Sequence, residues 1–256
     1  MMFFACVQGS AWAQENNFAE QIEPERVSHF QASLNRLGVS FTAPRKGKAI
    51  LVNIPAFELI AFAEGEPVFR SRTIVGAPWH RTPIMDTYTS VVRFRPTWRP
   101  TPPMIASGKY RDRIWPPGLK NPLGLAAVRL QPGLLIYLHD TNHRELFEHD
   151  MRALSHGCIR VQQWDKVIAW ILDIEMDEVH RLANGARTVD VAAPNIPVTL
   201  GYFTKFPNDA GKLVEYEDIY KRNSSGANRS LGNSTSQTVA QNDCIVPKPS
   251  TNGELD

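Results

Sequence analysis

The sequence has 256 residues, of which 43% are hydrophobic and 21% charged, and this length suits one substantial domain with appendages or two small domains. A formal net charge of +2 is too small to indicate a nucleic-acid-binding protein. No apolar run reaches the roughly 18 residues that a membrane-spanning helix needs, so we expect no membrane span.

The first residues are typical of a signal peptide whose start is missing. Met1–Val7 is a short apolar stretch, and Ala11-Trp12-Ala13 before Gln14 has the small-residue pattern of a cleavage site. We therefore predict a truncated signal peptide over residues 1–13 and an exported, periplasmic protein. Two alternatives are an apolar N-terminus without an export role and a lipoprotein attachment site at Cys6.

A short amphipathic helix and then a group of strands are predicted next. Apolar residues recur at helical spacing from Pro24 to Leu37, and Gly38 ends the pattern, so residues 14–46 are predicted to hold one helix and a linker. From Gly47 the pattern changes to β-branched and apolar runs separated by polar turns. We predict a β-meander over 48–54, 57–63 and 68–75.

Residues 96–124 are rich in Pro, Trp, Arg and Gly, which cannot form regular strands over that length. Such a long ordered loop in a compact domain is more often functional than idle. Its Trp98 and Trp115 could line a glycan groove, although packing inside the loop is the favoured interpretation. Arginines make the region locally basic, which indicates either a solvated surface or attraction to anionic peptides.

The second half of the chain returns to strands and adds helices. We predict strand structure over 128–138 around the turn Gln131-Pro132-Gly133, helices over 162–172 and 177–183, and strands over 188–191 and 197–204. Residues 223–256 are dominated by Ser, Asn, Gly, Thr and Gln and are predicted to be a disordered polar tail. The predicted fold class is mainly β, with two or three peripheral helices.

The predicted folded part contains one cysteine, Cys158, within Ser155-His156-Gly157-Cys158-Ile159-Arg160. A lone cysteine in an exported domain indicates a reactive thiol rather than a disulfide framework. A cysteine nucleophile needs a base and donors for the oxyanion. Gly157 allows close substrate approach and leaves the N–H groups of residues 157–159 for the oxyanion. Arg160 favours the thiolate and can pair with a carboxylate.

His139 is the candidate base, because it ends a predicted strand 19 residues before Cys158. A single cysteine is usually a small buried apolar residue, and a single histidine is usually a polar residue with its hydrogen bonds made. The occurrence of both in this spacing favours a catalytic role. The residues alone predict a cysteine nucleophile with a histidine base, for acyl transfer or peptide hydrolysis. His139, His143, His149 and His156 lack a metal-ligand spacing, so we expect no metal and no cofactor.

The segment from Ser155 to Arg160 resembles the catalytic motif of the YkuD-type L,D-transpeptidases, a histidine segment followed by S/T-x-G-C-x-R. The resemblance covers about residues 47–222 and includes Arg81-Thr82-Pro83-Ile84-Met85, Asn121-Pro122-Leu123-Gly124 and Glu217-Asp218-Ile219-Tyr220. It is greatest to the large periplasmic enzymes of Gram-negative bacteria, but the 14–42 segment is too short for their separate peptidoglycan-binding domain. We therefore expect substrate capture to rest on the catalytic domain or on a partner.

The resemblance implies an L,D-transpeptidase β-sandwich core over 47–222 and a specific reaction. Cys158 would attack the diaminopimelate carbonyl of a tetrapeptide stem, expel D-alanine, and pass the acyl group to an amine of another stem. His139 would be the base, oriented through the main-chain carbonyl of Asp140. His156 would line the pocket, Arg160 would hold the site or a carboxylate, and Thr141, Ser155 and Gly157 would support the site or bind substrate.

The implied partners are donor and acceptor stem peptides of peptidoglycan, together with wall-synthesis proteins. Carbapenems acylate such enzymes. The alternative function is a hydrolase on the same site, which would act on peptidoglycan or on a wall-attached lipoprotein with water in place of the amine. A third alternative is a wall-binding protein with a dead site, which the intact Cys158, His139 and Arg160 argue against.

Overall fold

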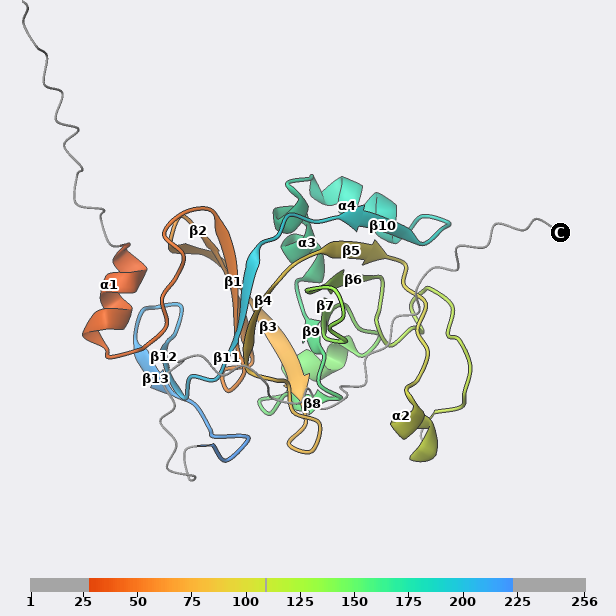
Figure 1. Cartoon of the computed structure of the whole chain (residues 1–256), viewed down its shortest axis with the longest axis horizontal. Helices are drawn as coiled ribbons and strands as arrows, with labels where there is room; N and C mark the ends of the chain where they lie inside the picture. The colour runs from red at the N-terminus through yellow and green to blue at the C-terminus, as the bar shows by residue number, and fades with distance from the viewer. Residues whose placement is uncertain (1–27, 109, 223–256) are drawn as a thin grey trace, which may run out of the picture.

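The computed structural model describes residues 28–108 and 110–222, so the predicted signal peptide and polar tail lie outside the described residues. The first element is the helix α1 (His29–Arg36), at one end of the molecule (Figure 1). Ser28 caps it by accepting a 3.1 Å hydrogen bond from the Gln31 N–H, and Gly38 follows it at φ +68°. Its Leu34 is buried against one end of the sheet, as the apolar spacing predicted.

The predicted meander is present as β1 (Lys48–Asn53), β2 (Glu58–Ala63) and β3 (Glu66–Gly76), paired antiparallel. The remaining strands that the structure describes are β4 (Met85–Tyr88), β5 (Val91–Phe94), β6 (Ala126–Arg129), β7 (Tyr137–His139), β8 (Ala153–Ser155), β9 (Ile159–Val161), β10 (Val189–Ala192), β11 (Pro197–Gly201), β12 (Lys205–Pro207) and β13 (Leu213–Glu215). The remaining helices are α2 (Pro102–Ala106), the 3₁₀-helix η1 (Arg144–Glu148), α3 (Trp164–Leu172) and α4 (Met176–Ala183).

Eleven strands form one continuous sheet in the order β10-β5-β6-β7-β9-β3-β2-β1-β11-β4, with β8 also paired to β3. The long strand β3 belongs to both halves of this sheet, because it pairs with β2 on one side and with β9 on the other. The sheet curls about β3, so the two halves face each other in a sandwich-like arrangement (Figure 1). The predicted mainly β class is thereby confirmed, with four α-helices and one 3₁₀-helix among the described residues where two or three helices were predicted.

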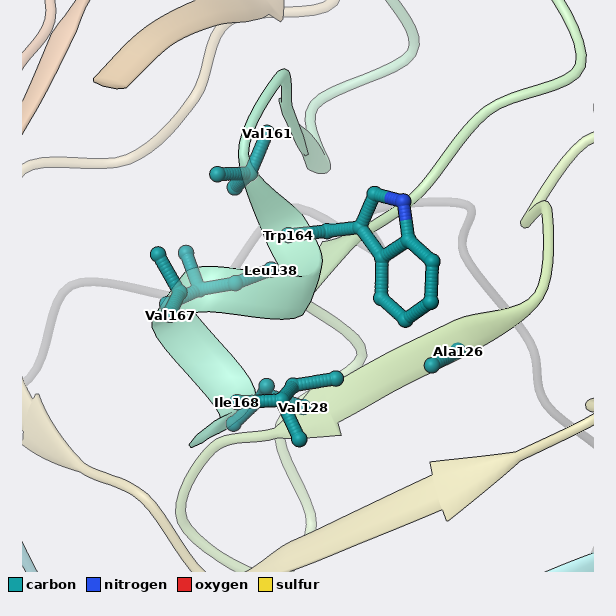
Figure 2. A pocket seen from close by; sticks show the side chains of 7 residues that line it. All are labelled: Ala126, Val128, Leu138, Val161, Trp164, Val167 and Ile168. Carbon is teal, nitrogen blue, oxygen red and sulfur yellow. The ribbon is translucent and has the colours of Figure 1, made fainter. Parts of the chain in front are cut away.

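The main core lies between the two halves and under α3 and α4. Val52 and Leu200 come from one half, Phe94 and Leu138 from the other, and all are at most 1% exposed. Figure 2 shows the side of this core at α3, where Trp164, Val167 and Ile168 line a small apolar gap together with strand residues. Burying one such side chain contributes about 1.5–3 kcal/mol, so these faces set the sheet's register.

Several sequence predictions differ from the structure in detail. The strand structure predicted over 128–138 around the turn Gln131-Pro132-Gly133 is present as β6 and β7, which begin or end within two residues of the predicted bounds, and Gly133 in the turn has φ +92°. The sequence analysis did not predict β4 and β5. Each of these strands has four residues, which is too short to show a clear periodicity. The loop over 96–124 contains the short helix α2 and a bridge between Trp98 and Trp115. No described helix has the length and apolar character to cross a membrane.

Candidate active site

Two parallel strands bring the predicted catalytic residues to one face of the sheet. β7 pairs with β9 so that Leu138 is level with Ile159, and His139 is level with Arg160. Side chains alternate along a strand, so His139 and Arg160 project from the face opposite to Leu138 and Ile159, which are in the main core. Cys158 directly precedes β9 and packs with Tyr137, two residues before His139, on the site face.

The His139 imidazole is buried and held by backbone carbonyls. Its Nδ1 donates to the carbonyl oxygen of Asp140, and because a carbonyl can only accept, Nδ1 carries the proton of the neutral ring. Burial and the nearby charge of Arg160 lower the pKa of His139 to about 3, against the carbonyls of Asp140 and Leu123, which raise it. The ring is therefore neutral at physiological pH, and Nε2 is the nitrogen that can accept a proton.

This low pKa predicts a stability effect that can be measured without substrate. Below pH 6.5 the unfolded chain binds a proton at His139 that the folded protein does not bind, so the free energy of unfolding falls as the pH drops toward 3. The expected slope is about 1.4 kcal/mol per pH unit. Urea unfolding of the wild type and His139→Gln at pH 7, 5.5 and 4.5 measures it. Parallel stability profiles for the two proteins would contradict the low pKa.

Asp140 connects the base to the end of the loop over 96–124. Its buried carboxylate accepts the Leu125 N–H at 2.9 Å and pairs with Arg144 at 2.7 Å. Burial raises the pKa of Asp140, while the Leu125 N–H and Arg144 lower it. Gly124 has φ +64°, and a Cβ atom there would lie 2.3 Å from Asp140 Oδ2, so only glycine fits. The Asp140 carboxylate thus fixes the loop, while its main-chain carbonyl holds the imidazole.

The turn that precedes β9 is held by two hydrogen bonds of the Ser155 hydroxyl. This hydroxyl accepts the Gly157 N–H at 3.0 Å and donates to the Cys158 carbonyl at 2.6 Å. Gly157 takes φ +110°, a conformation that favours glycine. The expectation that the Gly157 N–H would face an oxyanion is therefore wrong, because this donor is used within the turn. Thr141, on the other side of the site, likewise accepts a local hydrogen bond, from the His143 N–H at 3.1 Å.

Cys158 lies in a small apolar cluster between the sheet and the loop over 96–124. It is 2% exposed and packs with Trp98, Met104, Leu123 and Tyr137. The structure records Cys158 as disulfide-bonded. The sequence had favoured a thiol here, and because a disulfide sulfur is not a nucleophile, any chemistry at Cys158 requires its reduced form.

Arg160 and His156 complete the surroundings of Cys158. Arg160 is mostly buried, and burial lowers the pKa of its guanidinium. Electrostatic interactions with Tyr110 and Glu145 raise this pKa. No carboxylate of the described chain lies within ion-pair distance of its guanidinium. His156 is half-buried, and its ring lies 4.7 Å from that of His80. The site thus contains a cation next to the base and an imidazole pair beside the turn.

The loop over 96–124 is held in one conformation by Asn121. Its Nδ2 donates to the carbonyls of Pro96 and Pro116, and its Oδ1 accepts the Leu123 N–H, at 2.9 to 3.0 Å. Trp98 is 3% exposed, so the packing interpretation of this tryptophan is confirmed, and it is not a groove residue. Two of the local arginines are already paired, Arg93 with Asp190 and Arg99 with Asp112.

A comparison with protein families identifies this arrangement. The YkuD family, described as the L,D-transpeptidase catalytic domain, matches residues 47–191, more than half of the chain. The chain belongs to the YkuD family. The match spans β1 to β10 and includes β7, which ends at the candidate base, and the turn before β9, which contains the candidate nucleophile.

Curated relatives of this YkuD protein are similar over part of their length. A putative L,D-transpeptidase of Haemophilus influenzae is 28% identical over 214 residues, which are 67% of this chain and 44% of the relative. A probable L,D-transpeptidase of Escherichia coli, YcfS, is 35% identical over 134 residues, 48% of this chain and 39% of the relative. The chain thus spans less than half the length of these relatives.

Solved structures similar to this YkuD protein are also L,D-transpeptidases. The enzyme from Mycobacterium smegmatis is 15% identical, with a TM-score of 0.39 over 60% of this chain and 58% of that one. A catalytic domain from E. faecium acylated by ertapenem is 13% identical, with a TM-score of 0.36 over 61% of this chain and 98% of that one.

The structure also adds residues that sequence reasoning did not assign to the site. Thr82 and Tyr220 contact the cysteine turn or its neighbours, and Asn121 fixes the loop beside Cys158. All three were within segments that carried the family resemblance, but no spacing assigned them a role. Thr82 and Tyr220 bond to backbone atoms of distant segments, which leave no signal in a linear pattern, whereas Asn121 bonds mainly within its own loop.

Proposed function

We propose that this YkuD protein is an L,D-transpeptidase of peptidoglycan with Cys158 as nucleophile and His139 as base. The observation that carries the proposal is the register of β7 and β9, which puts His139, Arg160 and Cys158 on one face of the sheet. The family to which the chain belongs supports a substrate in the cell wall. On this proposal the protein is exported and works in the periplasm, where its substrate lies.

The first half-reaction would form a thioester. As the Cys158 sulfur attacks the diaminopimelate carbonyl of a tetrapeptide stem, Nε2 of His139 takes the thiol proton. The bond from that carbonyl to D-alanine then breaks, and the imidazolium gives the proton to the leaving amine. Because the pKa of His139 is low, the resting imidazole is neutral and can take the thiol proton as the sulfur attacks. Arg160 favours the negative sulfur or binds a stem carboxylate.

The second half-reaction would make the cross-link. The side-chain amine of another stem attacks the thioester, an amide forms, and the sulfur leaves as thiolate. His139 removes the proton of the attacking amine, and the proton returns to the sulfur. The acceptor would be an amine rather than water, and the apolar side chains around Cys158 support this because they limit the water near the thioester.

The direct test is mass spectrometry of the protein incubated with a disaccharide-tetrapeptide. A phosphine reductant keeps Cys158 as a thiol, and the thiol content is measured before the reaction. We expect loss of D-alanine together with dimers that are cross-linked between diaminopimelate residues. Cys158→Ala under the same conditions is the control for chemistry at the sulfur.

Two other outcomes would change the proposal. Tripeptide without dimers would show that water resolves the thioester and would assign the hydrolase function. An unchanged tetrapeptide, from protein whose thiol is shown to be reduced, would contradict both functions on this substrate.

A further inference from the structure

Three buried groups near the cysteine turn form a closed ring of hydrogen bonds. The Tyr220 hydroxyl donates to the Gly76 carbonyl at 2.6 Å, and the Gly76 N–H donates to Thr82 Oγ1 at 2.9 Å. The Thr82 N–H donates to the Tyr220 oxygen at 3.1 Å and closes the ring. Thr82 is 0% exposed and Tyr220 1%, so water does not compete for these bonds.

One bond leads from this ring to the turn that holds the nucleophile. Thr82 Oγ1 already accepts the Gly76 N–H, and its own proton goes to the Gly157 carbonyl at 2.9 Å. The direction of each hydroxyl proton is fixed, because the carbonyls of Gly76 and Gly157 can only accept. The ring is therefore a rigid support for the Gly157 carbonyl.

The Gly157 carbonyl and the Cys158 N–H belong to the same planar peptide unit. In a trans peptide these two groups point in opposite directions, so the bond from Thr82 directs the Cys158 N–H away from Thr82. Ser155 holds the same turn through the Gly157 N–H and the Cys158 carbonyl. Thr82 thus holds the Gly157–Cys158 peptide directly, and Ser155 holds the peptide units on either side of it.

We propose that Thr82 and Tyr220 are positioning residues for the nucleophile, because they set the orientation of the Gly157–Cys158 peptide and of its N–H toward the developing oxyanion. This inference rests on the proposed function. An oxyanion donor acts only when its orientation is fixed before the reaction, and the loss of one donor typically slows catalysis about 10²–10³-fold. If the Cys158 N–H is turned away from the oxyanion, the rate should fall by part of this factor.

The C-terminal segment of the described chain is therefore part of the site. Tyr220 lies beyond the residues that match the family, 47–191, and is held by Tyr202, whose hydroxyl accepts the Tyr220 N–H at 2.8 Å and donates to Asp218 at 2.6 Å. The rings of Tyr202 and Tyr220 are stacked, with centroids 5.5 Å apart. This segment places the Tyr220 hydroxyl over Gly76 and Thr82.

The chain offers a matched control for Thr82. Thr89 is also 0% exposed, and its hydroxyl also donates to a backbone carbonyl, that of Pro194, and accepts a backbone N–H, that of Ile196. It lies at the junction of β4 and β5, away from the cysteine turn. Thr82→Val and Thr89→Val therefore lose equivalent hydrogen bonds, and only Thr82→Val loses the support of the turn.

The experiment measures the rate constant for acylation by a carbapenem and the melting temperature of each variant. We expect both valine variants to melt at lower temperature, and only Thr82→Val to be acylated at least about 10-fold more slowly. Thr82→Ser keeps the hydroxyl and should restore the rate. Tyr220→Phe removes two bonds of the ring and should also slow acylation, at a temperature where the variant is folded.

The outcomes separate this inference from the proposed function. Acylation of Thr82→Val at the rate of Thr89→Val, with the wild type labelled normally, would overturn the positioning role alone. Equal slowing of both valine variants would assign Thr82 a purely structural role. Absence of labelling in the reduced wild type would instead contradict the proposed function.

Discussion

Replacement of Cys158 by alanine is expected to abolish covalent labelling by a carbapenem. The labelling forms a bond from the sulfur to the opened lactam carbonyl, and no other cysteine is present in residues 28–222. The change removes one sulfur atom from a small apolar cluster, so we expect the folded protein to persist. Intact-protein mass spectrometry after incubation with ertapenem, with a phosphine reductant present, measures the adduct.

The same adduct is measured on the wild type under reducing and non-reducing conditions. Because the structure records Cys158 in a disulfide, we expect labelling of the wild type to require the reductant. A circular dichroism spectrum like that of the wild type shows that Cys158→Ala is folded. A persistent adduct on the folded, reduced variant would place the nucleophile at another residue.

Replacement of His139 by alanine is expected to slow acylation about 10²–10⁴-fold at neutral pH, the usual contribution of a general base. The neutral ring presents Nε2 as acceptor, because Nδ1 is bonded to the Asp140 carbonyl. The measurement is the rate of carbapenem acylation followed by stopped-flow absorbance.

His143→Ala is the matched control for this variant. His143 follows the same strand, but its side chain is 56% exposed and pairs with Glu145 on the surface. It should be acylated at the wild-type rate. If His139→Ala also retained a near-normal rate, His139 would have no part in proton transfer, and the thiol would be activated by another group.

Acylation of His139→Ala can also be measured at high pH. A thiol without its base still ionises in alkaline solution, so the rate of the variant should rise with pH and approach that of the wild type. A variant that stays slow at every pH would indicate that His139 holds the site together rather than transferring a proton.

Sequence patterns predicted the strands and helices whose periodicity is strong. The meander over 48–75, the helix around Val167 and Ile168, and the helix that ends before Gly38 are present close to the predicted positions. The strands β4 and β5 were missed, and β5 contains the charged Arg93, whose pairing partner Asp190 is almost a hundred residues away. The boundaries of the export signal, the linker and the tail stay predictions.

The candidate site was likewise predicted where it depends on residues close together in the sequence, and not where it depends on contacts between distant segments. Residue chemistry and motif spacing identified Cys158, His139 and Arg160 and their neighbours Asp140, Thr141, Ser155, His156 and Gly157, and the structure brings the first three to one face. Their functional roles stay proposals. The sequence also predicted that Gly157 would offer its N–H to the oxyanion, which is wrong because that N–H is bonded to Ser155.

The sequence by itself determined the family, the mainly β class and the residues of the candidate site, because these depend on residue types at short, fixed spacings. Only the tertiary structure decided that Thr82 and Tyr220 support the Gly157 carbonyl and that burial lowers the pKa of His139 to about 3. These properties arise from contacts between segments that lie far apart in the chain, and no local pattern of residues specifies such contacts.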